Sequence, residues 1–152
     1  LIMEFGGLRD PWAELVEIRE IIEPELAFRA ALRANSDDID AMRDAIADMD
    51  VAMGDADAFI RADNRFHLAL ARATQNTFVP RLLDSVVDVL QELRGQMFWV
   101  DGGPQRGQAH HKRIFRAIED RAPEAAREAM RAHLDQVRRD SQTAQQQEEQ
   151  HE

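Results

Sequence analysis

Helix-forming residues dominate this chain over long stretches that are interrupted at only a few points. The stretches are rich in Ala, Leu, Glu, Arg and Met, whereas glycine occurs 7 times and proline 5 times in 152 residues. No segment shows the alternation of β-branched residues that predicts a strand. Because 44% of the residues are hydrophobic, the chain is able to bury a core of its own. We therefore expect a single all-α domain.

Apolar spacing and capping signals divide the chain into helices. Pro24 is expected to kink or divide the first helix, and Ser36 is expected to cap the second. The run Asp101-Gly102-Gly103-Pro104 is the strongest loop signal. The expected buried stripe of the first helix comprises Leu15, Ile18, Ile22, Leu26 and Leu32. The helices are expected at residues 10–34, 36–53, 55–74, 78–98, 105–120 and 123–139.

The two ends of the chain differ from the part between them. Residues 1–9 are interpreted as the remnant of a linker, and residues 10–140 as the helical domain. Residues 141–152, SQTAQQQEEQHE, contain no apolar residue beyond one alanine and are expected to be disordered.

The charge and residue types exclude several classes of function. Lys and Arg total 19 against 29 Asp and Glu, a net charge of -10, so we expect no direct binding of nucleic acid by this chain. The absence of cysteine excludes disulfides and thiolate sites. No segment has the roughly 18 apolar residues of a membrane span, and residues 1–9 lack the basic start and long apolar core of a signal peptide. A cytoplasmic protein without membrane contact is expected.

Four polar residues occupy positions where the helical period predicts apolar side chains. Asp63 and His67 lie one turn apart on the buried face expected for residues 55–74, with Phe59, Phe66, Leu70 and Ala73 or Thr74 as its other members. His111 shares a face with Ile114, Phe115 and Ile118, and His133 shares one with Ala126, Met130, Leu134 and Val137. His110 stays an alternative to His111, because a small change of register exchanges the two.

The spacing of the last two histidines predicts that they meet. The turn near residue 122 lies midway between His111 and His133, so in an antiparallel hairpin both lie about 16 Å from the turn at a rise of roughly 1.5 Å per residue. One such histidine alone is usually a hydrogen-bonded core residue. Four polar residues together instead predict a divalent metal site of Asp63, His67, His111 and His133, with Zn or Ni as the first candidates and Mn, Fe or Co as alternatives.

These residues also carry a resemblance to a known family. The runs ADNRFHLALARATQN and HHKRIFRAIEDRAPEAAREAMRAHL resemble the C-terminal effector-binding (FCD) domain of FadR-subfamily GntR-type bacterial transcription regulators. The run EIREIIEPELAFRAALRA resembles the first helix of that domain, so the resemblance covers about residues 10–140. It implies an antiparallel bundle of six to seven helices that forms a homodimer and binds a small carboxylate effector.

The resemblance also assigns roles to single residues. In the metal-containing subtype the ligands correspond to Asp63, His67, His111 and His133, and the effector-binding arginine of the first helix corresponds to Arg19. Asn76 corresponds to a residue that is structural or that supports the metal ligands. The winged-helix domain that binds DNA in the family is missing from this chain.

Position alone adds Arg94 and Trp99, near the end of the fourth helical region, as candidates for the wall of the effector pocket. The sequence therefore predicts a ligand-sensing domain and not an enzyme. Two alternatives stay open: a metal-dependent hydrolase or oxygenase on a helical bundle, and a metal-free helical interaction module with hydrogen-bonded histidines.

Overall fold

The structure is a computed structural model, and it describes residues 6–151. Seven α-helices and no strand occur within that range, which confirms the all-α prediction. Residues 1–5 of the predicted linker lie outside the described residues. The helices are α1 (Pro11–Arg33), α2 (Ser36–Val51), α3 (Ala56–Ala73), α4 (Phe78–Ser85), α5 (Val87–Phe98), α6 (Gly103–Glu119) and α7 (Pro123–Glu149).

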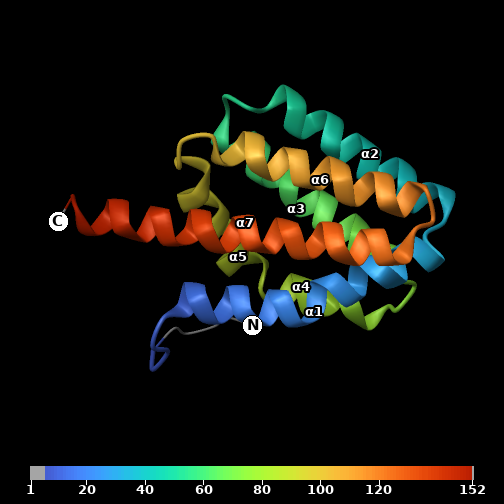
Figure 1. Cartoon of the computed structure of the whole chain (residues 1–152), viewed down its shortest axis with the longest axis horizontal. Helices are drawn as coiled ribbons and strands as arrows, with labels where there is room; N and C mark the ends of the chain where they lie inside the picture. The colour runs from blue at the N-terminus through green and yellow to red at the C-terminus, as the bar shows by residue number, and fades with distance from the viewer. Residues whose placement is uncertain (1–5, 152) are drawn as a thin grey trace.

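The bundle is built around three neighbouring pairs of helices. α7 packs mainly against α1 and α6, and α2 packs mainly against α3 (Figure 1). The short helices α4 and α5 lie against α3, and α5 also contacts α7. Figure 1 shows that α7 runs along the bundle and that its last turns extend past the other helices. Among the described residues, no helix combines the length and apolarity that crossing a bilayer requires.

Local capping explains where several helices begin. The side chain of Asp10 accepts from the backbone N–H of Ala13 at 3.1 Å, and that of Asp55 accepts from Ala58 at 3.1 Å. The prediction that Ser36 caps the second helix is wrong, because Asn35 is the cap. Asn35 and Asp38 form a reciprocal capping box that places Ser36 in the first turn.

Two helix boundaries differ from those expected. Pro24 does not divide α1, which continues to Arg33. The single helical region expected at residues 78–98 is instead two helices, with Val86 between them. The Ser85 hydroxyl donates to the carbonyl of Leu82 at 2.6 Å, and the N–H of Val86 bonds to Leu83 three residues back, so the regular helical ladder ends there.

The tail that was expected to be disordered is helical as far as Glu149. The polar composition of the tail gives no sign of its packing, but Ser141 and Ala144 in its first turns are buried. Gln145 donates to Asp10 at the start of α1 at 3.2 Å, so the tail packs along the first helix. A helix stabilised by such tertiary contacts needs little apolar sequence of its own.

The predicted buried stripe of α1 is also wrong in part. Ile18, Ile22 and Leu32 are 53%, 44% and 57% exposed. The face of α1 that is buried carries small residues instead, which allow close approach of neighbouring helices. Its buried members are Val16, Arg19, Pro24, Ala27, Ala30 and Ala31.

Candidate metal centre

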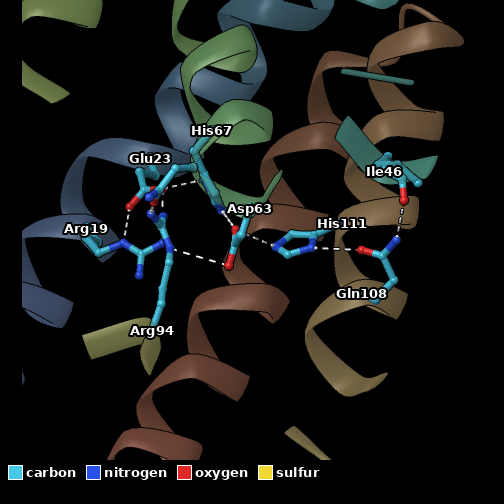
Figure 2. Close-up of polar contacts among 9 residues, drawn as sticks. Arg19, Glu23, Ile46, Asp63, His67, Arg94, Gln108 and His111 are labelled. Atoms are coloured by element: carbon cyan, nitrogen blue, oxygen red, sulfur yellow. Dashed lines mark hydrogen bonds and ion pairs between the residues drawn. The ribbon is translucent and has the colours of Figure 1, made fainter. Parts of the chain in front are cut away.

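Three helices bring the predicted ligands together in the interior. Asp63 and His67 come from α3, His111 from α6 and His133 from α7, and each side chain is buried. One ring nitrogen from each of the three histidines lies within 4.8 Å of the other two. Asp63 Oδ1 lies 3.1 Å from His67 Nε2 and 3.4 Å from His111 Nε2 (Figure 2). His111 and His133 meet as the hairpin spacing predicted, with their ring centroids 4.7 Å apart.

The facing atoms of this group lack hydrogen-bond partners. Asp63 Oδ1, His67 Nε2, His111 Nε2 and His133 Nδ1 are buried, and none makes a hydrogen bond of acceptable geometry. A buried polar atom without a partner costs about 1–3 kcal/mol. A divalent cation held by the three histidines, with Asp63 Oδ1 beside two of them, would satisfy these atoms, because imidazole nitrogens and a carboxylate oxygen are the ligands that Zn and its neighbours prefer. The donor set therefore fits the predicted metal.

The surroundings hold these residues in the protonation states that bind a metal. Burial lowers the pKa of His111 to about 3 and the pKa of His133 well below its ordinary value, so both rings are neutral. Burial alone disfavours an ionised Asp63, but the charge of Arg94 holds the pKa of that carboxyl well below its ordinary value. Neutral imidazoles and an ionised carboxylate are the forms in which these side chains coordinate metals.

Two residues that the sequence did not single out support the histidines. Glu23 Oε1 lies 3.4 Å from Nδ1 of His67, and Gln108 Oε1 lies 3.2 Å from Nδ1 of His111 (Figure 2). Such partners on the far nitrogen orient a ligating imidazole. Gln108 stands one turn before His111, and that spacing is the only signal by which the sequence could have shown it.

A small cavity adjoins the group. Its volume is about 40 Å³, and its lining includes Arg19, Asp63, Arg94, His111, His133 and Gln136. The Arg19 guanidinium binds Glu23 with its Nε at 2.5 Å, while its Nη1 is buried without a partner. Arg94 lies with Nε 3.4 Å from Asp63 Oδ2, and its Nη2 also lacks a partner. The cavity is therefore lined by two cations with unused donors beside the predicted ligands.

The other predicted site residues lie elsewhere. Trp99 is 74% exposed and does not line the cavity, whereas its neighbour Phe98 does. Asn76 is exposed and accepts from the N–H of Phe78 at 3.1 Å, so it stabilises the start of α4 and supports no histidine. His110 stands outside the three-histidine group, with its ring centroid 5.9 Å from that of His133.

Residues 14–136 match the family model of the FCD domain. The chain belongs to the FCD domain family. This confirms the resemblance that the motifs carried, and it places the candidate site inside the matched residues.

Several relatives of this FCD domain are named as transcription regulators. The chain is 32% identical to the HTH-type transcriptional regulator LutR of Bacillus subtilis over 82% of this chain and 59% of LutR. It is 30% identical to the galactonate operon transcriptional repressor of Escherichia coli over 74% of this chain and 50% of the repressor. The chain spans about half the length of these relatives.

A solved structure agrees with the fold. The Streptococcus agalactiae GntR structure superposes with a TM-score of 0.70 and 26% sequence identity, covering 89% of this chain and 63% of that chain. The all-α architecture of this FCD domain is therefore shared with a GntR protein.

Proposed function

We propose that this FCD domain senses a small carboxylate at a buried divalent metal, as part of a GntR-type transcription regulator of the cytoplasm. The observation that carries the proposal is the buried group of three histidines, His67, His111 and His133, with Asp63 Oδ1 beside two of them. Two buried arginines line the adjoining cavity. Zn or Ni is the first candidate for the ion, with Mn, Fe or Co as alternatives. With four protein ligands, an ion that accepts five or six ligands would keep one or two positions for oxygen ligands, and it would supply Lewis acidity toward a carboxylate there.

The chain's own residues supply the rest of the binding site. Arg19 Nη1 and Arg94 Nη2 have unused N–H groups at the cavity, and guanidinium groups bind carboxylates through paired hydrogen bonds. Glu23 holds the opposite edge of Arg19 and thereby directs Nη1 away from itself. A cavity of about 40 Å³ suits a compact anion.

Binding at this cavity would reach the rest of a regulator through α1. Arg19 and Glu23 belong to α1, and Glu23 also lies against His67 of α3. An effector that binds Arg19 would therefore change how α1 packs against the site. Such a signal requires two packings with different affinities for the effector. DNA would be bound by a separate winged-helix domain, since this domain has a net charge of -10.

An apolar face supports homodimer formation, the arrangement that suits twofold operators. A groove of about 240 Å³ lies between α1 and α4, and apolar side chains dominate its lining. Exposed residues on these helices flank it, namely Ile18, Ile21, Ile22, Phe78 and Leu82. We assign this face to a second copy of the domain. A monomer at micromolar concentration in sedimentation would contradict the assignment.

Elemental analysis tests the metal part of the proposal. Protein purified without a metal-affinity column is expected to carry a transition metal and to melt at a lower temperature after chelation, because a ligand that binds only the folded state stabilises it. Small carboxylates should then raise the melting temperature of the metal-loaded protein and not of the variant Arg19→Met. No metal, and no stabilisation on its return, would leave a metal-free interaction module. Turnover of esters would instead identify a metal-dependent enzyme.

A further inference from the structure

We propose that Gln108 is a positioning residue that fixes the tautomer of His111, so that Nε2 of the ring presents its lone pair to the metal. The inference rests on the proposed metal site and adds a residue of α6 that does not itself touch the ion. Figure 2 shows the chain of contacts that carries it, from Ile46 through Gln108 and His111 to Asp63.

The orientation of the Gln108 amide is determined by its neighbours. Its Nε2 donates to the backbone carbonyl of Ile46 at 2.9 Å and to Oδ1 of Asp50 at 2.9 Å. Both partners are acceptors only, so the nitrogen end of the amide must face them. Gln108 is 3% exposed, and its Oε1 is therefore held inside the bundle, 3.2 Å from Nδ1 of His111.

The fixed amide determines which nitrogen of His111 carries the proton. An amide oxygen only accepts, so Nδ1 of His111 must donate to it. A neutral imidazole has one N–H, and Nε2 is then left with a lone pair. His111 Nε2 lies 3.4 Å from Oδ1 of Asp63, which is also an acceptor. Two acceptors facing each other in a buried site are stabilised by a cation between them.

Asp50, which accepts from the Gln108 amide, lies at the surface of the protein. Asp50 is half-exposed and pairs with Lys112 Nζ at 2.9 Å, so its carboxylate is held where Gln108 needs an acceptor. Without Gln108, the other tautomer of His111 is favoured, because an N–H at Nε2 then finds an acceptor in Asp63. That tautomer has no lone pair for a metal. The side chain of Gln108 therefore favours the tautomer of His111 that can bind a metal over the tautomer that donates to Asp63.

The decisive comparison uses Gln108→Met, which keeps the side-chain length but removes the acceptor, and Gln105→Met, the same change at an exposed position of α6. Proton–nitrogen NMR of the histidine rings in metal-stripped protein should show His111 with its proton on Nδ1 in wild type and Gln105→Met, and on Nε2 in Gln108→Met. The metal dissociation constant of Gln108→Met should rise by about 10–100-fold. An unchanged tautomer and an affinity within twofold of wild type would overturn the proposal.

The Asp50 variants keep the test decisive if Gln108→Met fails to fold. Asp50→Asn retains an oxygen that accepts from Gln108, whereas Asp50→Ala removes it. Metal affinity and the Nδ1 proton should be preserved in Asp50→Asn and weakened in Asp50→Ala. Equal behaviour of both variants and wild type would overturn the role of the amide. A wild-type protein that binds no metal would instead refute the proposed function, while the NMR result would still test the tautomer assignment.

Discussion

The interior of the bundle contains one apolar region and one polar region. Along α6, His111 and Ile118 are two turns apart, about 10 Å at 1.5 Å per residue, and both are buried. Around Ile118 lies a continuous apolar cluster that includes Met42, Met49 and Met130. Around His111 lie Asp63, His67 and His133, whose facing atoms have no partners. Both residues belong to the same helix, but the side chains around His111 are polar and those around Ile118 are apolar.

The difference separates the part of the domain that stabilises the fold from the part that we propose binds a ligand. The apolar cluster is complete as it stands, because burial of its side chains is favourable without any further molecule. The polar region differs, because buried atoms without partners lower the stability of the fold unless a bound ion satisfies them. Each region should therefore respond differently to the metal.

The largest effect is expected from removing one metal ligand. His133→Ala should abolish metal retention, because three remaining ligands of the predicted four hold the ion less well and the cavity beside it admits water. Metal content after purification measures this directly. His110→Ala is the matched control, since His110 stands outside the three-histidine group. Equal metal loss in both variants, or unchanged metal content in His133→Ala, would contradict the assignment.

A change in the apolar cluster should instead act on stability alone. Met42 is completely buried, so Met42→Ala should lower the free energy of unfolding by about 2–5 kcal/mol through lost contacts and a residual cavity. The loss should be the same in metal-loaded and metal-stripped protein, as measured by denaturant unfolding with and without chelator. A loss that depends on the metal would show that the two regions are coupled and would break the comparison.

The sequence was most informative where periodicity and residue type disagree. Asp63 and His67 stand in an apolar stripe, and that conflict predicted their burial, which the structure confirms. The same periodicity failed for α1, where the large residues Ile18 and Ile22 are exposed while Arg19 is buried. Periodicity identifies the apolar face of a helix, but it does not say whether that face meets the core or a surface groove.

The supporting contacts could not be predicted because they join distant parts of the chain. Gln108 is placed by a backbone carbonyl of α2, 62 residues away, and its local sequence shows only that it stands one turn before His111. Similarly, the tail at residues 141–149 lacks apolar character, and its helix is explained by packing along the start of α1. The roles of such residues depend on tertiary contacts, so they can be assigned only when the structure is known.

A smaller effect, of opposite sign, is expected when the polar region is made apolar. In metal-stripped protein, His133→Leu should raise the free energy of unfolding by about 1 kcal/mol, because it removes a buried Nδ1 that has no partner. With metal present, wild type should be the more stable of the two. Denaturant unfolding in chelator and in excess metal tests this reversal. His110→Leu also removes a buried Nδ1 without a partner but lies outside the three-histidine group, so its effect should not depend on the metal. A variant that is less stable than wild type in both conditions would mean that the polar region needs no ion.

The smallest effect is expected at the exposed aromatic residue that was predicted to line the pocket. Trp99 is 74% exposed and contacts Phe98 edge-on, with ring centroids 5.2 Å apart. Trp99→Ala should change the free energy of unfolding by about 0.5 kcal/mol or less. It should also leave unchanged the melting shift that small carboxylates produce, because Phe98 and not Trp99 lines the cavity. Phe98→Ala, at the neighbouring position, should reduce that shift. Loss of the carboxylate response in Trp99→Ala would place the indole at the ligand and extend the polar region to the surface of the bundle.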